Sequence, residues 1–115
     1  MTFLSIIIPA HNEEKRLPET LRSIESFVRV QPYTVEVLVV ENGSVDKTAQ
    51  VVRDYGVEHL HIRLLREPGR GKGIAVRRGM LAAHGEFRFM CDADLSMPIE
   101  QVARFLPPQL TDFDV

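Results

Sequence analysis

The sequence is poor in the residues that build disulfide, zinc or membrane structures. Its 115 residues include one cysteine, Cys91. A single cysteine excludes a disulfide framework and a zinc knuckle, and it favours a reducing compartment, so we expect a cytoplasmic protein. The apolar stretch at residues 3–9 is too short to span a bilayer and lacks the basic region and cleavage site of a signal peptide. We therefore expect no segment to enter a membrane.

The sequence also lacks an excess of charge of either sign. Its 14 Lys and Arg residues and 16 Asp and Glu residues give a formal net charge of −2 at pH 7. This balance gives no electrostatic basis for nucleic-acid binding, so any anion must be bound by a local arrangement of groups. Hydrophobic residues make up 44% of the chain, which suits one globular domain with a modest core.

Short, mainly apolar runs alternate with stretches of helical periodicity. The runs have the pattern of strands buried on both faces of a parallel sheet, and they lie at residues 3–8, 35–40, 60–65 and 87–91. Helices are predicted at residues 16–30, about 44–55, 74–83 and 98–105, with Gly56 and Gly85 closing the second and third. Short connections between alternating strands and helices predict a mostly parallel sheet covered on both faces, which is a three-layer α/β/α fold.

Polar residues follow every predicted strand at its carboxyl end. In open α/β sheets, ligands bind beyond these ends, at the point where the strand order reverses. If the sheet has the strand order three, two, one, four, that point lies between the first and fourth strands and brings His11 and Glu13 beside Asp92. The polar segments that follow the strands are residues 9–14, 41–44, 70–73 and 92–94.

Asp92 and Asp94 suggest a metal site. At ~6 Å and an effective dielectric of ~20, two carboxylates repel each other by roughly 3 kcal/mol, so a site that keeps both ionised normally contains a cation or a basic group. Mg²⁺ and Mn²⁺ prefer such oxygen ligands and complete their coordination with water and phosphates. Taken alone, the pair is more often a solvated acidic loop, and the other polar segments are what favour a metal.

Residues 70–73, Arg-Gly-Lys-Gly, are suited to binding an anion, because the interleaved glycines allow backbone amides to approach it closely. Two familiar phosphate motifs fail here. A Walker loop needs Ser or Thr where Gly73 stands, and a dinucleotide fingerprint starting at Gly71 needs glycine where Val76 stands. The alternative to anion binding, that Arg70 and Lys72 are solvated charges of a surface loop, therefore stays open.

Together, four ordered segments resemble the donor-binding half of family 2 glycosyltransferases with the GT-A fold. They are residues 5–14, 39–48, 70–80 and 92–94. Residues 13–18 and 70–73 are most similar to the dolichyl-phosphate or polyprenyl-phosphate glucosyltransferases of that family. The resemblance implies a Rossmann-like, nucleotide-sugar-binding domain over residues 1–115. Because residues 113–115 look like the start of a further strand, we expect the chain to be truncated. In the family that the chain resembles, the acceptor site lies in the carboxyl-terminal half, so the resemblance implies that this chain lacks the acceptor half and is inactive alone.

The resemblance implies a UDP- or GDP-sugar donor, a Mg²⁺ or Mn²⁺ ion, and an acceptor such as a polyprenyl or dolichyl phosphate, with peripheral membrane contact an option for the full-length protein. It makes Asp92 and Asp94 the catalytic metal ligands, with Ser96 near them. Glu41 and Asn42 stand where the family usually has two aspartates that recognise the base, which leaves the base open. The implied nucleotide-binding residues are Pro9, Ala10, His11, Asn12, Glu13, Glu41, Asn42, Gly43, Arg70, Lys72, Asp92 and Ala93.

Two other classes fit part of this pattern. A sugar-phosphate nucleotidyltransferase has a similar architecture, but it normally carries a basic, glycine-rich loop after the first strand, unlike residues 9–12, Pro-Ala-His-Asn. A phospho-acceptor signalling domain also has an acidic pocket. Its key aspartate, however, follows a strand in the middle of the sheet order, and it makes little use of a basic glycine loop.

Overall fold

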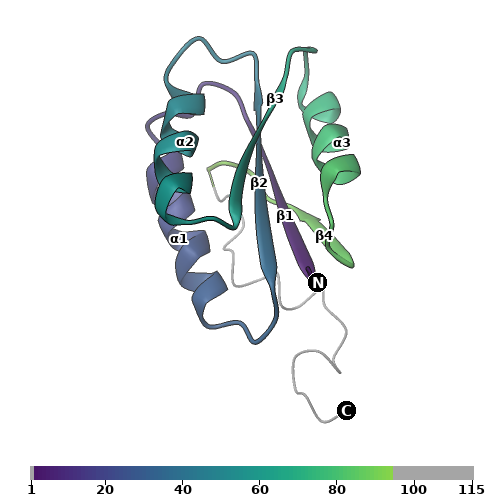
Figure 1. Ribbon diagram of the computed structural model, residues 1–115. Helices are drawn as coiled ribbons and strands as arrows, with labels where there is room; N and C mark the ends of the chain where they lie inside the picture. The colour runs from purple at the N-terminus through teal and green to yellow at the C-terminus, as the bar shows by residue number, and fades with distance from the viewer. Residues whose placement is uncertain (1, 95–115) are drawn as a thin grey trace.

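A computed structural model describes residues 2–94 of the chain, in which strands and helices alternate (Figure 1). Among these residues, no helix is both long and apolar enough to cross a bilayer. The predicted helix at 98–105, the predicted strand at 113–115 and Ser96 lie outside the described residues. The elements are β1 (Leu4–Ala10), α1 (Leu17–Arg29), β2 (Val35–Asn42), α2 (Thr48–Glu58), β3 (Ile62–Glu67), α3 (Lys72–Ala82) and β4 (Phe87–Met90).

The strands form one parallel sheet with the order β3-β2-β1-β4, which confirms the predicted strand order. Leu4 of β1 lies opposite Val35 of β2 on one side and Phe87 of β4 on the other. Helices α1 and α2 cover one face of the sheet and α3 covers the other, as Figure 1 shows. The three-layer α/β/α arrangement predicted from the sequence is therefore confirmed.

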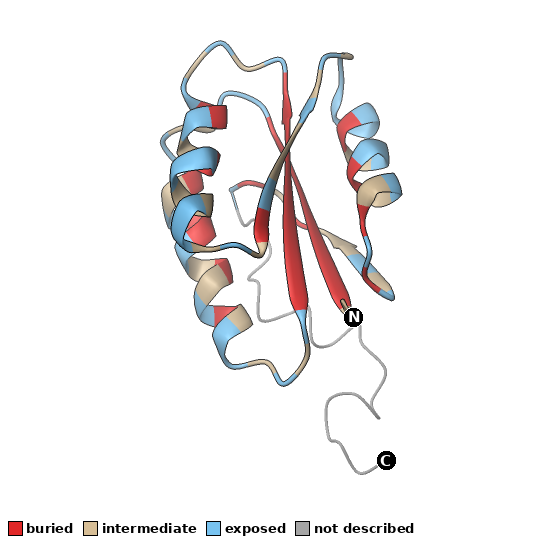
Figure 2. Cartoon of the chain, viewed as in Figure 1, coloured by how far each residue is buried: buried red, intermediate tan, exposed pale blue. Residues whose placement is uncertain are grey.

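The core lies on both faces of β1 and β2, in which every residue is buried (Figure 2). Successive side chains of a strand point to opposite faces, so each central strand contributes to two apolar layers. Full burial of a Leu or Ile side chain stabilises the fold by about 1.5–3 kcal/mol. On the α1 and α2 side the core includes Ile6, Ile8, Val37, Val39, Leu17, Leu21, Ile24 and Val52, and on the α3 side it includes Ile7, Leu38, Val40 and Ala75.

β1 continues through Pro9 to Ala10, beyond its predicted end at residue 8. The carbonyls of Phe3 and Ile7 accept hydrogen bonds from Phe87 and Cys91, so the odd-numbered residues of β1 direct their peptide groups toward β4. Because β4 ends opposite Ile7, the ladder stops before it reaches Pro9. The missing N–H of proline therefore interrupts no strand pairing.

The second helix also differs from its predicted limits. It begins at Thr48, whose N–H donates to Asp46 Oδ1 at 2.9 Å, and it runs through Gly56 to Glu58. The prediction that Gly56 ends this helix is wrong, because Gly56 is not among the described residues with positive φ. A Cβ atom at Gly56 would lie 3.3 Å from the carbonyl oxygen of Ile62, so close packing on the first residue of β3 favours glycine there.

The third strand and the third helix also have limits that differ from the predicted ones. β3 covers Ile62–Glu67 instead of residues 60–65, because Arg66 and Glu67 pair with the last residues of β2 while Leu60 is exposed. α3 begins at Lys72 instead of residue 74. Gly71 precedes it with φ +107°, a left-handed value that favours glycine, so the loop turns directly into the helix.

Candidate functional site

A cavity of about 750 Å³ opens at the carboxyl ends of β1, β2 and β4. Its wall includes Ala10 from β1, Asn42 from β2, Ala75 from α3 and Asp92 after β4. This volume lies within the range of about 300–1,000 Å³ that is typical of ligand pockets. Because parallel strands end at the same edge of the sheet, residues distant in the sequence meet in one site.

Most of the predicted site residues line this cavity. Pro68, Gly69, Gly71 and Ala75 line it as well and are missing from the predicted set, although the glycine-rich composition of residues 68–73 could have indicated them. His11, Glu13 and Asp92 line the same cavity, as expected from the strand order, while the roles of the individual residues stay predictions. The predicted residues in the wall are Pro9, Ala10, His11, Glu13, Asn42, Gly43, Arg70, Lys72, Asp92, Ala93 and Asp94.

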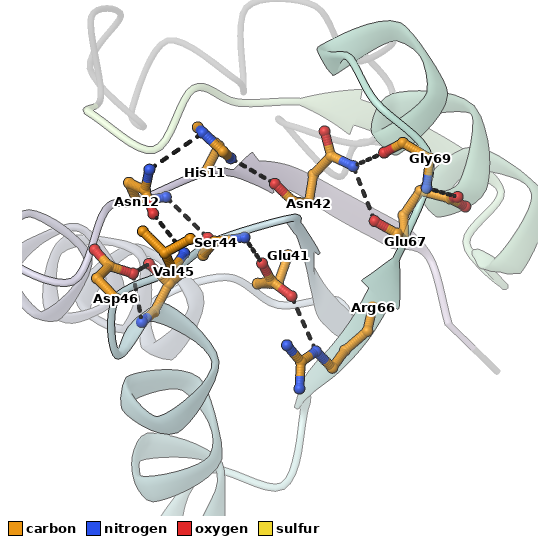
Figure 3. A network of polar contacts seen from close by, with 11 residues as sticks. His11, Asn12, Glu41, Asn42, Ser44, Val45, Asp46, Arg66, Glu67 and Gly69 are labelled. Carbon is orange, nitrogen blue, oxygen red and sulfur yellow. Dashed lines mark hydrogen bonds and ion pairs between the residues drawn. The ribbon is translucent and has the colours of Figure 1, made fainter.

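Glu41 points into the protein and does not line the cavity. Its carboxylate is buried and accepts hydrogen bonds from the Ser44 N–H and from Arg66 Nε, the latter at 2.9 Å (Figure 3). Burial by itself raises the pKa of Glu41, but these hydrogen bonds and the Arg66 charge outweigh it and hold the pKa below its usual value. In this structure Glu41 stabilises the turn between β2 and α2 as an ionised group.

Asn42 connects β2 to the glycine loop through both ends of its side-chain amide. Nδ2 donates to the carbonyls of Glu67 and Gly69 (Figure 3). Oδ1 accepts from the Gly71 N–H at 3.2 Å. An aspartate could not donate to two carbonyls. This gives a physical reason for asparagine at a position where the resemblance leads one to expect aspartate, because Asn42 positions the loop that carries Arg70.

The loop after β1 is joined to the loop after β2 by side-chain hydrogen bonds. Asn12 has φ +54°, its N–H donates to Ser44 Oγ at 2.9 Å, and its Oδ1 accepts from the Val45 N–H at 2.9 Å. Asp46 accepts from the Glu14 N–H at 3.2 Å. Burial raises the pKa of Asp46, but hydrogen bonds from Thr48 and Glu14 lower it more, so the net shift is downward. The two loops therefore form one unit.

His11 is held at the cavity wall by its ring nitrogens. Nδ1 lies 2.6 Å from the carbonyl oxygen of Asn42, and Nε2 lies 3.2 Å from Asn12 Nδ2. A carbonyl only accepts hydrogen bonds, so Nδ1 carries a proton and Nε2 accepts from the amide. This arrangement defines both the tautomer and the orientation of the ring.

Asp92 and Asp94 lie in a turn that is anchored to α1 and neutralised by two basic side chains. Lys72 Nζ is 2.5 Å from Asp92 Oδ1, and an Arg16 guanidinium nitrogen is 3.6 Å from Asp94 Oδ2. The buried hydroxyl of Thr20 donates to the carbonyl of Ala93 at 2.5 Å. The expectation that two neighbouring ionised carboxylates need positive charge beside them is confirmed by these pairs.

The chemistry of the site fits a divalent ion that completes its coordination outside the protein. Among residues 2–94 there is no group of three or more His, Cys, Asp or Glu side chains that could hold a metal. Two accessible carboxylates match Mg²⁺ or Mn²⁺, which bind one or two carboxylates plus water and substrate phosphates. Cys91 does not line this cavity, and burial and then the charges of Asp92 and Asp94 raise the pKa of its thiol to about 11.

Comparison with known sequences places this chain among glycosyltransferases. Residues 5–115 match the model of the family described as Glycosyl transferase family 2. Dolichyl-phosphate beta-glucosyltransferase ALG5A of Trichomonas vaginalis is 39% identical over 104 residues, which are 85% of this chain and 32% of that protein. The human dolichyl-phosphate beta-glucosyltransferase is 40% identical over 79% of this chain and 31% of its own length. The chain thus spans about a third of the length of these curated relatives.

Comparison with solved structures gives the same result. Mannosyltransferase PcManGT from Pyrobaculum calidifontis, in complex with GDP-Man and Mn²⁺, has a TM-score of 0.73 and 30% identity over 87% of this chain and 30% of its own. Glucosyl-3-phosphoglycerate synthase from Mycobacterium tuberculosis, in complex with UDP, has a TM-score of 0.72 and 28% identity over 96% of this chain and 40% of its own. The architecture is that of GT-A glycosyltransferases, and the chain belongs to glycosyl transferase family 2.

Proposed function

We propose that the cavity binds the nucleotide diphosphate of a UDP- or GDP-sugar together with Mg²⁺ or Mn²⁺. The observation that carries this proposal is that the glycine loop with Arg70 and Lys72 lines the same cavity as Asp92 and Asp94. A diphosphate needs cations and peptide N–H groups for its charge, and it supplies the oxygen ligands that a divalent ion lacks here. Known structures similar to this chain contain GDP-Man with Mn²⁺, or UDP.

We further propose that the whole protein transfers the sugar to a polyprenyl phosphate such as dolichyl phosphate. The support is the similarity to dolichyl-phosphate beta-glucosyltransferases from several organisms. A phosphate acceptor is already anionic at neutral pH, so it needs no general base. Residues 1–115 then form the nucleotide-sugar-binding part of the enzyme. The family assignment argues against the nucleotidyltransferase and the phospho-acceptor domain, which have only the general architecture in common with this chain.

In the proposed reaction, the bond between the anomeric carbon and the diphosphate oxygen breaks while the acceptor oxygen forms a new bond to that carbon. Negative charge then grows on the leaving diphosphate. Lys72 lines the cavity, so its ammonium group is within reach of this charge and can neutralise it. A divalent ion held by Asp92 and Asp94 would supply further leaving-group stabilisation as a Lewis acid. Thr20 contributes indirectly, because its hydroxyl holds the backbone of the turn at Ala93.

The nucleoside is proposed to lie against the part of the cavity wall formed by Pro9, Ala10, His11 and Glu13. The ring of His11 is oriented by the Asn42 carbonyl, so it offers a preorganised surface to a base or ribose. Because the Asn42 amide is engaged by the glycine loop, we propose that Asn42 affects the nucleotide through the position of that loop. Base recognition by Glu41, which the resemblance implies, would require its carboxylate to leave Ser44 and Arg66.

Isothermal titration calorimetry tests this function on the full chain. UDP-glucose and GDP-mannose are titrated with and without Mn²⁺, and at least one of them is expected to bind in a metal-dependent manner. Asp94→Asn keeps the shape of the side chain but removes its charge, so it should weaken donor binding in Mn²⁺ about tenfold or more. The matched control is Asp54→Asn on α2, an exposed carboxylate outside the cavity that accepts from Gln50 at 2.8 Å.

Two results would contradict the proposal. One is binding of equal strength with and without Mn²⁺. The other is an Asp94→Asn variant that binds both donors as tightly as the Asp54→Asn control does.

A further inference from the structure

Each carboxylate of the turn at residues 92–94 faces a basic side chain from a different helix. Lys72, the first residue of α3, pairs with Asp92 at 2.5 Å, and Arg16, which immediately precedes α1, pairs with Asp94 at 3.6 Å. We propose that Lys72 and Arg16 are built-in counter-ions that a divalent ion must displace, and that only Lys72 is then taken up by the nucleotide diphosphate. This inference rests on the function proposed above.

The two cations compete with a metal because they use the oxygen atoms that would bind it. An ammonium group 2.5 Å from Asp92 Oδ1 occupies the approach to that oxygen, and a divalent ion in the same place would be repelled strongly by it. The pairs are also exposed enough to exchange. The Lys72 and Asp92 side chains are 56% and 37% exposed, and those of Arg16 and Asp94 are 63% and 44% exposed. Ion pairs of this exposure are weak, so a metal can displace them.

The two cations differ in what they can contact after displacement. Lys72 lines the main cavity, so its ammonium group can turn to a diphosphate bound there. Arg16 is absent from that wall and lines a second cavity of about 460 Å³, which also includes the acidic side chains of Glu14 and Asp46. A displaced Arg16 would find its new partners among these carboxylates, away from the donor.

This difference predicts that Lys72 and Arg16 affect metal affinity in the same way but differ in their effect on the coupling between metal binding and nucleotide binding. Both cations oppose the binding of a metal in the absence of nucleotide. Only Lys72 should link metal to nucleotide, because the diphosphate stabilises the arrangement in which Lys72 has left Asp92. By thermodynamic linkage, the nucleotide then raises metal affinity by the same factor as the metal raises nucleotide affinity.

The test measures Mn²⁺ binding to the full chain by the electron paramagnetic resonance signal of free Mn²⁺, with no nucleotide present. Lys72→Met and Arg16→Met are each expected to bind Mn²⁺ about three- to tenfold more tightly than wild type. Lys15→Met is the matched control, since it removes an exposed positive charge next to Arg16 that has no ion pair to the turn among the described residues. Arg16→Lys retains the charge and should stay near wild type.

In a second arm, UDP or GDP is added at saturating concentration. Wild type and Arg16→Met should then gain Mn²⁺ affinity, whereas Lys72→Met should lose most of that gain. Circular dichroism checks that each variant is folded, as expected for exposed positions.

The proposal is overturned if neither Met variant binds Mn²⁺ more tightly than Lys15→Met, including the case in which no variant binds measurably. The proposal is also overturned if a nucleotide raises the Mn²⁺ affinity of Lys72→Met by as much as it raises that of wild type. Failure of both nucleotides to bind would sink the proposed function instead, and the nucleotide-free arm would still decide whether the two cations oppose the metal.

Discussion

Replacement of Gly79 by alanine tests how closely α3 packs on the sheet. Gly79 is buried in the middle of α3, and a Cβ atom there would lie 2.5 Å from Ile7 Cγ2 and 3.1 Å from Val40 Cγ2. Carbon atoms in contact normally lie about 3.5–4.0 Å apart. Ile7 and Val40 are fully buried in the two central strands, so neither can move aside without disturbing the core.

The magnitude follows from two opposing effects. Overpacking of a well-packed core costs about 1–3 kcal/mol, and alanine gains about 0.5–1 kcal/mol over glycine in a helix interior. Because the shortest contact is with a side chain that is fully buried, we expect the upper part of this range and a net loss of about 2 kcal/mol in the free energy of unfolding. For a domain of this size that lowers Tm by about 10 °C. Displacement of α3 would also shift Lys72 in the cavity wall, away from its place beside a bound diphosphate, and weaken donor binding.

The assay is thermal and urea unfolding followed by circular dichroism. Gly73→Ala is the control, since it makes the same substitution in the first turn of the same helix, where an added Cβ atom meets nothing within 4 Å. We expect this control to be neutral or slightly stabilising, by about 0.5 kcal/mol. The packing argument is refuted if Gly79→Ala is as stable as Gly73→Ala.

Two further perturbations act on single polar contacts. Thr20→Val leaves the carbonyl of Ala93 without its donor, so it should lower the free energy of unfolding by about 1–2 kcal/mol and weaken Mn²⁺ binding, whereas Thr20→Ser should retain both. The folded pKa of Glu41 lies below its usual value of 4.5, so its contribution to stability is present above that pH and is lost as the pH falls through the lower, folded pKa. Glu41→Gln should therefore destabilise the chain at pH 7 and lose this effect in acid. Unfolding measured at several pH values checks this, and a pH-independent difference would contradict it.

The order of elements and the class of the fold could be predicted from the residues because burial leaves a local pattern. Residues 35–40 are nearly continuous apolar side chains, and such a run is stable only as a strand covered on both faces. Element limits were less predictable. Glycine often ends a helix, but α2 continues past Gly56, which packs closely on the first residue of β3. Which glycine takes a left-handed conformation depends on such neighbours.

Much of the candidate site could also be predicted, because parallel strands bring their carboxyl ends together whatever their distance in the sequence. His11, Lys72 and Asp92 were expected in one place for this reason, and they line one cavity. The structural roles of Glu41 and Asn42, which hold the neighbouring loops by hydrogen bonds, could not be predicted in this way. Both follow from β3, which brings Arg66 to the buried carboxylate and the Glu67 carbonyl to the amide.

The sequence alone therefore determined the kind of site and the segments that build it, since motif spacing and strand ends are local properties of the chain. Only the tertiary structure decided which polar groups face the cavity and which form the hydrogen bonds that fix the loops around it. It showed Arg16 at Asp94, a contact that no spacing in the sequence indicates. Hydrogen-bond partners and counter-ions are chosen by what packs nearby, and that depends on how the helices are placed on the sheet.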